Sequence, residues 1–196
     1  MNSTFEEKRS KCNALVLFDN NLLLQWEAGT AHTLAKIHRH LFTGVFEFAG
    51  EWRTVNIAKG NFRFASARYL ERVLKDIDAM PFHNFDEIID KYVEMNIAHP
   101  FREGNGRSMR LWLNGMLHHT LHQVVSWQKI ERTAYLTAMT YSPYNAQPLK
   151  KLLHTALTEE GSNRLRFMRD LDASYAYEEM TTYRTESLDK SECGHK

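Results

Sequence analysis

The sequence predicts an all-α protein that carries one small β-hairpin. The chain has 196 residues, of which only four are proline and nine are glycine. Apolar residues recur at helical spacing through most of the chain, whereas strict alternation is confined to one short region. A chain of this length can form one domain with a sizeable core, and no internal repeat or second domain is visible in it.

The first predicted elements are a helix over Thr30–Phe42, a hairpin over residues 54–65 and a helix over Arg68–Met80. Thr30 can cap the first helix, and its apolar face includes His38, which we interpret as a core histidine with a hydrogen-bond partner. The hairpin is expected because residues 54–58 and 62–65 alternate around the turn Lys59-Gly60-Asn61.

The central helix is expected to begin after Asn84 and to end at about Ala98. Asn84 can cap it, and Glu87 follows three residues later as in a capping box. Pro100 disfavours helical geometry at His99, so the helix should stop there. Four more helices are then expected, near Gly106 onward, Glu131–Thr140, Pro148–Leu157 and Arg164 onward.

The chain divides into three parts on this interpretation. Residues 1–160 form the main domain, and residues 161–180 form a C-terminal helix packed on it after the break at Gly161-Ser162-Asn163. Residues 181–196 are rich in Thr, Ser, Glu and Lys, so we expect a disordered tail.

Charge and cysteine content favour a cytoplasmic localisation. The formal net charge is +1, which gives no overall attraction to nucleic acid or to an anionic membrane. Cys12 and Cys193 form no disulfide framework, so we interpret them as incidental thiols of a reduced protein. The apolar run Ala14–Phe18 is too short for a signal peptide, and no segment is long enough to span a membrane.

The segment His99–Arg110, HPFREGNGRSMR, lies between two predicted helices and carries the candidate chemistry. Gly104-Asn105-Gly106 opens the second helix, where free backbone amides and the positive end of the helix dipole favour an anion. Arg107 and Arg110 are three residues apart and project from the same side of the first turn. Two guanidinium groups beside free amides suit a polyphosphate.

Two further side chains complete this predicted site. Glu103 would repel phosphate unless a divalent cation lay between them, which makes it a candidate Mg²⁺ ligand. His99, with an ordinary pKa of about 6.5, can take a proton from an attacking hydroxyl. Taken singly, Gly104-Asn105-Gly106 could be only a turn at a helix start, and His99 could be only a core histidine. Together these residues predict phosphoryl or nucleotidyl transfer.

These residues resemble the signature of the Fic family, H-x-F-x-[D/E]-G-N-G-R-x-x-R, at every fixed position. The similarity extends to Ile37-His38-Arg39, Phe48-Ala49-Gly50 and Lys59-Gly60, and so covers most of residues 30–120. It implies a Fic-type helical fold and transfer of AMP from ATP to a Ser, Thr or Tyr hydroxyl of a target protein. It also implies the roles of the loop residues: His99 as general base, Glu103 as Mg²⁺ ligand, Gly104, Asn105, Gly106 and Arg107 around the phosphates, and Arg110 at the terminal phosphate.

The resemblance gives roles to two other segments. It makes the hairpin a flap that docks the target by strand pairing, with the flap residues Ile57, Lys59, Gly60, Phe62 and Phe64. Fic enzymes also carry an inhibitory helix with the pattern [S/T]-x-x-x-E-[G/N], which Ser174 and Glu178 fit within the last predicted helix. Glu179 departs from this pattern, since Gly or Asn is expected there. Tyr175, Tyr177 and Tyr183 are candidates for self-modification.

Several alternatives stay open at this point. The same site could remove AMP from a modified protein, with Glu178 positioning a water molecule, or could transfer phosphate or phosphocholine. A non-catalytic nucleotide-binding module is the alternative of another class, although such a module needs no base at His99. By resemblance only, the target would be a type II topoisomerase subunit, and a homo-oligomer would be a second restraint on activity.

Overall fold

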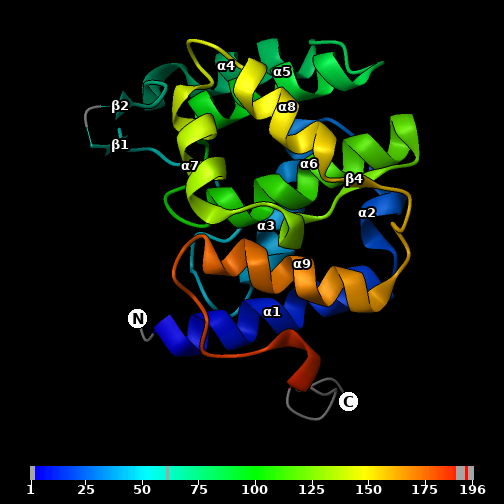
Figure 1. Ribbon diagram of the computed structural model, residues 1–196. Coiled ribbons are helices and arrows are strands. Elements are labelled where there is room, and N and C mark those ends of the chain that lie inside the picture. The colour runs from blue at the N-terminus through cyan, green and yellow to red at the C-terminus, as the bar shows by residue number, and fades with distance from the viewer. Residues whose placement is uncertain (1–2, 61, 189–192, 194–196) are drawn as a thin grey trace.

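The protein is predominantly helical, as the sequence predicts (Figure 1). A computed structural model describes residues 3–60, 62–188 and 193. Its α-helices are α1 (Ser3–Asp19), α2 (Leu22–Gln25), α3 (Ala31–Phe42), α4 (Leu70–Asp78), α5 (Phe85–Ala98), α6 (Asn105–Leu121), α7 (Arg132–Tyr141), α8 (Gln147–Thr155) and α9 (Arg164–Ala176). Short 3-10 turns are η1 (Ala67–Tyr69), η2 (Trp127–Lys129) and η3 (Thr185–Ser187).

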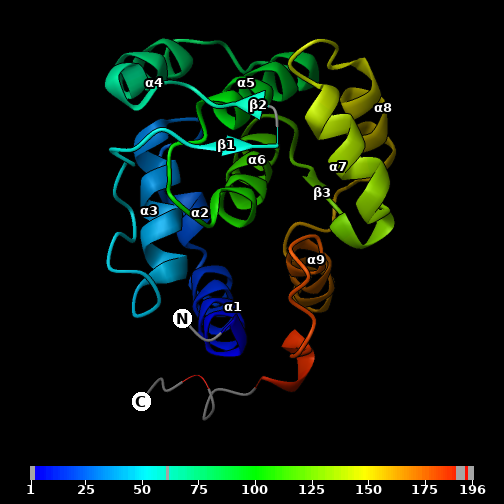
Figure 2. The ribbon, with the colours of Figure 1, turned by 90° about the vertical axis from the view of Figure 1, so that its left-hand side faces the viewer.

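Helix α6 lies at the centre and packs against α3, α5 and α9 (Figures 1 and 2). Its side chains Trp112, Leu113 and Met116 are fully buried, because apolar residues at this spacing cover the faces that meet the neighbouring helices. Helices α1 and α9 lie side by side below it and contact each other. The segment His99–Gly104, between α5 and α6, therefore connects two helices that pack against each other.

Two small antiparallel sheets complete the fold. Strands β1 (Ala58–Lys59) and β2 (Phe62–Arg63) form the predicted hairpin, and Figure 2 shows it in front of α6. Lys59 was expected in the turn, but it pairs with Phe62 and so belongs to strand β1. Both strands are shorter than predicted. Strands β3 (Val124–Val125) and β4 (Leu157–Thr158) were not predicted.

The predicted helix caps are confirmed. Thr30 Oγ1 accepts a hydrogen bond from the amide of Thr33 at 3.1 Å. Asn84 Oδ1 accepts from the amide of Glu87 at 3.0 Å, and the Glu87 carboxylate accepts in return from His83 at 2.8 Å. The return bond of the capping box therefore reaches one residue further upstream than the usual pattern, and it still satisfies a free amide before the helix.

Helix α1 is a correction, because the sequence analysis expected no helix before Thr30. Its buried side chains include the charged pair Glu7 and Lys11, whose carboxylate and ammonium groups lie 3.0 Å apart. Lys11 Nζ also donates to the carbonyl of Tyr183 at 2.6 Å. Because charged residues occupy part of the buried face, the apolar periodicity that would reveal the helix is weak.

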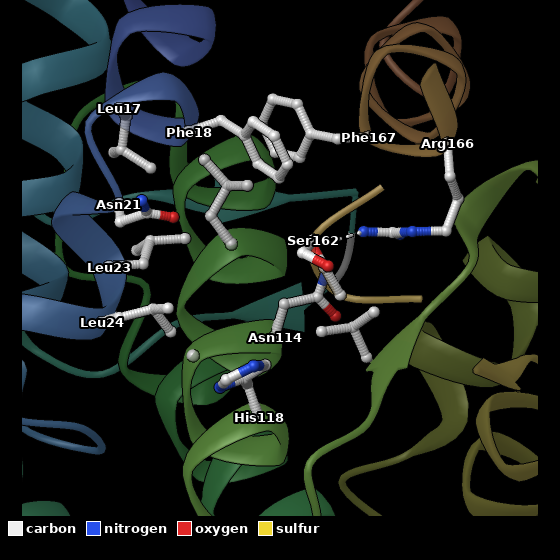
Figure 3. A pocket seen from close by; sticks show the side chains of 14 residues that line it. Leu17, Phe18, Asn21, Leu23, Leu24, Asn114, His118, Ser162, Arg166 and Phe167 are labelled. Atoms are coloured by element: carbon white, nitrogen blue, oxygen red, sulfur yellow. Dashed lines mark hydrogen bonds between the residues drawn. The ribbon is translucent and has the colours of Figure 1, made fainter. Parts of the chain in front are cut away.

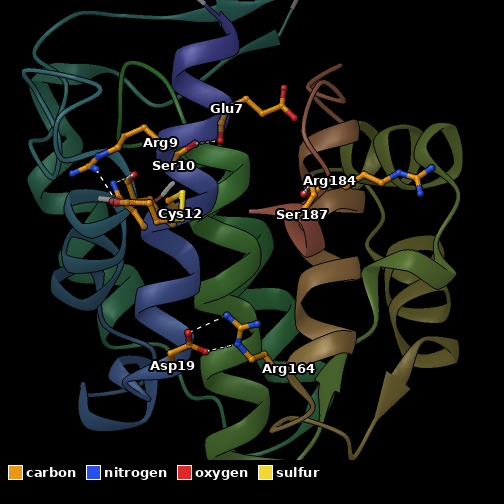
Figure 4. Close-up of a disulfide and its surroundings, with 11 residues drawn as sticks. Glu7, Arg9, Ser10, Cys12, Asp19, Arg164, Arg184 and Ser187 are labelled. Carbon is orange, nitrogen blue, oxygen red and sulfur yellow. Dashed lines mark hydrogen bonds and ion pairs between the residues drawn. A yellow bond between two sulfur atoms is a disulfide. The ribbon is translucent and has the colours of Figure 1, made fainter. Parts of the chain in front are cut away.

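The interpretation of the two cysteines as free thiols is wrong. Cys12 and Cys193 form a disulfide, with their Cα atoms 5.3 Å apart, instead of two free thiols (Figure 4). Residues 181–188, expected to be disordered, run along α1, where the Glu7 carboxylate accepts from the amides of Thr182 and Tyr183 at 3.0 Å each. Residues 189–192 and 194–196 of the predicted tail lie outside the described residues.

No helix in the described part of the chain is long and apolar enough to cross a membrane.

Candidate active site

His99 ends helix α5 in a left-handed backbone conformation, with φ of 46°. Its amide still closes the last helical turn by donating to the carbonyl of Met95 at 2.9 Å. Left-handed geometry is unfavourable for a residue with a Cβ atom, so neighbouring groups must hold it. Arg53 provides such a contact, since its Nε donates to the carbonyl of His99 at 2.8 Å.

The imidazole of His99 is oriented as a base. Its Nδ1 atom lies 3.3 Å from the carbonyl oxygen of Asn96, and a carbonyl can only accept, so Nδ1 carries the proton. Nε2 is then left with a free lone pair. The ring stacks on Phe64 of the hairpin, with centroids 3.8 Å apart.

Burial, together with the cations of Arg53 and Lys59, lowers the pKa of His99 to about 4, against the opposing effects of the Asn96 carbonyl and the Glu178 carboxylate. The ring is consequently neutral at pH 7 and can accept a proton.

The loop itself is closed by Asn105. Its side-chain oxygen accepts from the amide of Phe101 at 2.9 Å, and its side-chain nitrogen donates to the carbonyl of Phe101 at 2.8 Å. Asn105 was predicted as a phosphate ligand, but both polar atoms of its side chain bind the backbone of Phe101 and stabilise the loop conformation. The amides of residues 105–107 precede the first helical hydrogen bond of α6, from Ser108 to the carbonyl of Gly104 at 3.2 Å, so these are the amides expected to bind an anion.

His38 supports the loop from α3. Gly50 donates its amide to His38 Nδ1 at 2.9 Å, so Nε2 carries the proton and donates to the carbonyl of Glu103, also at 2.9 Å. The ring stacks on Phe101 with centroids 3.7 Å apart, and burial lowers its pKa to about 4. The interpretation of His38 as a core histidine with a partner is confirmed, and the partner is the catalytic loop.

The structure brings Glu178 and both loop arginines together. Glu178 Oε1 lies 3.0 Å from Arg110 Nη2, and Glu178 Oε2 lies 2.7 Å from Arg107 Nε. Arg110 also donates through Nε to the hydroxyl of Ser174 at 2.6 Å and through Nη2 to its carbonyl at 2.8 Å. Helix α9 ends at Ala176, so Glu178 lies in the turn that follows it and not within the helix as expected.

The sequence analysis missed a second carboxylate at this place. Glu6 of α1 lies with Oε1 2.8 Å from Arg107 Nη2. The guanidinium of Arg107 is also enclosed by the rings of Phe42 and Tyr175, at 4.8 and 5.4 Å from their centroids. Burial alone would lower the pKa of Arg107, but the carboxylates of Glu178 and Glu6 outweigh it and the pKa is raised. Glu6 escaped notice because α1 itself was not predicted.

Glu103 is the one carboxylate of residues 99–110, and its side chain is 61% exposed. Its Oε1 accepts from the amide of Gly104 at 3.1 Å and lies 4.0 Å from Arg107 Nη2. The described residues contain no cluster of three or more His, Cys, Asp or Glu side chains that could hold a metal. One carboxylate with free coordination positions fits Mg²⁺ that is shared with phosphate oxygens.

The predicted flap lies beside the base. Lys59 and Gly60 are exposed, and Ile57, Phe62 and Phe64 are half-buried. The rings of Phe62 and Phe64 lie edge to face with centroids 5.3 Å apart. Because Phe64 also stacks on His99, the hairpin and the base share one side-chain cluster.

A separate cavity lies away from the loop, between α1, α2, α6 and the start of α9 (Figure 3). Figure 3 shows the rings of Phe18 and Phe167 stacked at one end and Asn114 and His118 of α6 on its wall. None of residues 99–110 lines this cavity. The candidate catalytic residues therefore lie in the loop and do not line this cavity.

Comparison with known proteins gives a consistent result. Residues 29–117 match the model of the Fic/DOC family. The chain is similar to the protein adenylyltransferase VbhT of Bartonella schoenbuchensis, with 32% identity over 146 residues, which cover 67% of this chain and 30% of that protein. It is also similar to the probable protein adenylyltransferase Fic of Escherichia coli, with 30% identity over 113 residues, which cover 52% and 56%. The alignments thus span about a third to a half of these relatives.

Solved structures share the fold. The N-terminal Fic domain of a putative cell filamentation protein from Bartonella quintana, with bound ADP, matches with a TM-score of 0.68 and 19% identity, over 79% of this chain and 85% of that one. The BepC protein from Bartonella tribocorum, with bound AMPPNP, matches with a TM-score of 0.61 and 23% identity, over 75% and 84%. At these identities the likeness shows the fold alone.

Proposed function

Since this chain belongs to the Fic/DOC family through its residues 29–117, we propose that it transfers the AMP moiety of ATP to a hydroxyl side chain of a target protein. The observation that carries the proposal is the neutral His99, whose free Nε2 lies beside a helix start with two buried arginines. A base, an anion site and cations in one loop are what nucleotidyl transfer to a hydroxyl requires.

The reaction is an in-line displacement at the α-phosphorus of ATP. His99 Nε2 takes the proton of the attacking Ser, Thr or Tyr hydroxyl, whose oxygen forms the new bond to phosphorus. The bond from the α-phosphorus to the bridging oxygen breaks, and pyrophosphate leaves. The free amides at the start of α6, Arg107 and Arg110 stabilise the negative charge of the leaving phosphates.

Glu103 would hold a Mg²⁺ ion together with phosphate oxygens of the nucleotide. Its accessible carboxylate beside the loop amides supports this role. The ion would supply positive charge next to the phosphates. In its absence the Glu103 carboxylate would repel the phosphates of the nucleotide.

Glu178 keeps the resting enzyme largely inactive on this proposal. Its carboxylate forms ion pairs with both Arg107 and Arg110, the two cations assigned to the phosphates. A triphosphate must displace Glu178 before Arg110 can contact its terminal phosphate. Movement of the turn after α9 would therefore switch the enzyme on.

The test is AMP transfer from α-labelled ATP with Mg²⁺ to the proteins of a cell lysate. We expect label on protein that increases for Glu178→Gly and is lost when His99→Ala is added. If the Glu178→Gly variant binds ATP but labels no protein, the chain is a nucleotide-binding module instead. Release of AMP from protein labelled beforehand would favour the reverse reaction, and label from γ-labelled ATP would indicate phosphate transfer.

A further inference from the structure

Arg53 is a buried cation in the chain segment that connects α3 to the hairpin, and it is only 2% exposed. Its guanidinium donates to four backbone carbonyls: His99 at 2.8 Å, Val55 at 2.7 Å, Ala98 at 3.1 Å, and Ala65. No carboxylate pairs with it among the ion pairs of the described residues. Burial of a charge without an ionic partner is costly, and the hydrogen bonds to these four carbonyls offset part of that cost.

The four carbonyls belong to two functional segments. Ala98 and His99 form the end of α5, where the base is located. Val55 and Ala65 precede β1 and follow β2, so they are the two legs of the hairpin. One side chain therefore joins the backbone of the base to both legs of the candidate docking flap.

Backbone hydrogen bonds strengthen the same connection. The amide of Arg53 donates to the carbonyl of Pro100 at 2.8 Å, and the amide of Ala65 donates to the carbonyl of Ile97 at 3.0 Å. The first bond joins the segment before the hairpin to the residue after His99. The second joins the end of the hairpin to a residue two positions before His99. A shift of the hairpin cannot leave the His99 backbone in place without breaking several of these bonds.

The chemistry of arginine suits this position. The last carbonyls of a helix have no helical partner and carry the negative end of the helix dipole, so a cation is favourable there. A guanidinium offers several donors in one rigid plane, whereas an ammonium is a point charge on a flexible stem. Only the planar group can fix the helix end and both hairpin legs relative to each other.

We propose that Arg53 is a positioning residue that couples the docking hairpin to the catalytic base. A target strand that pairs with the hairpin acts on the same guanidinium that holds the backbone of His99 in its left-handed conformation. The proposal rests on the proposed function for its catalytic consequence, but the mechanical connection between the hairpin and His99 can be measured without activity.

The catalytic test uses the Glu178→Gly protein as parent and adds Arg53→Gln, Arg53→Lys or, as a control, Arg72→Gln on the exposed surface of α4. We expect Arg53→Gln to lower the rate of lysate labelling at saturating ATP by about 100-fold, because displacement of a reacting group by about 1 Å has that effect. AMPPNP affinity should stay within about twofold of the parent, since the guanidinium of Arg53 donates to backbone carbonyls and not to the groups assigned to phosphate. Arg53→Lys should recover only a small part of the rate.

Two readouts separate positioning from a purely structural role. The acidic limb of the pH–rate profile should move to higher pH in Arg53→Gln and not in Arg72→Gln, because a cation near His99 is removed. Added methylguanidinium should restore labelling by Arg53→Gly, whereas methylammonium should not. Labelling by Arg53→Gln within about twofold of the parent would overturn the proposal.

Hydrogen exchange tests the connection in the unsubstituted protein, independently of activity. The amides of Arg53 and Ala65 should exchange at the slow rate of the His99 amide, because all three open together. In Arg53→Lys all three should lose protection, while the amide of the buried Leu153 inside α8 keeps its protection. Fast exchange at Ala65 beside a protected His99 would refute the coupling, whereas a parent that fails to label would refute only the proposed function.

Discussion

The carboxylate of Glu178 lies 3.0 Å from Arg110 Nη2, so the last arginine of residues 99–110 has an anionic partner within the protein itself. Arg110 is 3% exposed, and Ser174 fills two more of its hydrogen-bond positions. The contact comes from the segment after α9, far from the loop in sequence. Nucleotide affinity should consequently depend on whether this segment stays in place.

Glu178→Gln should strengthen AMPPNP binding, because the neutral amide no longer competes with phosphate for Arg110. A hydrogen bond to a charged group contributes about 1.5–3 kcal/mol, which corresponds to about a 10- to 100-fold lower Kd. Titration calorimetry measures the change, with the neighbouring Glu179→Gln as the control of equal charge. Equal affinity of Glu178→Gln and the unsubstituted protein would mean that Glu178 does not compete with the nucleotide.

Glu179→Gly should stabilise the protein. Glu179 adopts a φ of 64° just after Glu178, and its amide and that of Met180 close the end of α9 through the carbonyls of Ala176 and Tyr175. Glycine adopts this conformation freely, so the change should add about 1 kcal/mol to the free energy of unfolding. The exposed ion pair with Arg132 contributes little to oppose it.

Urea unfolding measures this effect, and Glu179→Ala is the matched control because it loses the same ion pair but keeps the Cβ atom. Only the glycine variant should unfold at higher urea. A glycine variant no more stable than the alanine variant would show that the left-handed position carries no strain. The pattern of the Fic inhibitory segment, with Gly or Asn at this place, thus has a backbone explanation.

The loop and its flanking helices could be predicted because their signals are local. Asn84 caps α5 through its own side chain, and Pro100 ends it, so both effects act within a few residues. Glu178 could be placed near Arg110 only through a family pattern, since 68 residues separate them. Spacing alone carries no information about such a contact.

Features that depend on long-range packing were missed. Helix α1 escaped because Glu7 and Lys11 are buried as a pair, which hides its apolar face. The disulfide escaped because Cys12 and Cys193 are 181 residues apart in the sequence. Arg53 carries no motif of its own, and its four carbonyl partners become visible only in three dimensions.

Acid should destabilise the protein through His38. Its pKa is lowered to about 4 in the folded state, below the value of about 6.5 expected when unfolded. Between these values the unfolded chain binds the extra proton, so the free energy of unfolding falls as pH falls from 6.5 to 4. At pH 4 the loss from His38 is about 3 kcal/mol.

His38→Gln removes this titration and leaves the other groups unchanged. We expect the variant to be less stable at pH 7 but to lose about 3 kcal/mol less than the parent between pH 7 and pH 4, as measured by urea unfolding. Parallel pH profiles of the two proteins would show that His38 is not held neutral by the loop carbonyl and the Gly50 amide.

Reduction of the Cys12–Cys193 disulfide should lower stability. The bond connects α1 to the C-terminal segment and closes a loop of most of the chain, so its loss should cost about 2–5 kcal/mol. Thermal unfolding of Cys193→Ser should match that of the parent with dithiothreitol, and Ser187→Ala on the exposed 3-10 turn should match the untreated parent. A melting temperature of the parent that does not respond to dithiothreitol would exclude a contribution from the bond.

Gly104→Ala should destroy the shape of the anion site. Gly104 has a φ of 77°, and a Cβ atom there would lie 2.4 Å from Phe42 Cε2 in the packed core. Gly60 in the hairpin also has a positive φ, of 57°, but a Cβ atom there would meet nothing within 4 Å. The two substitutions therefore share the backbone cost and differ in the steric clash.

Gly60→Ala should lower the free energy of unfolding by about 1 kcal/mol, and Gly104→Ala by about 2–4 kcal/mol. AMPPNP binding should be retained in Gly60→Ala and lost in Gly104→Ala, since the amides at the start of α6 would no longer converge. Calorimetric titration and urea unfolding measure the two effects separately. Normal AMPPNP affinity in a folded Gly104→Ala protein would place the nucleotide outside this loop, because no phosphate could remain on the loop amides once residues 104–106 had shifted.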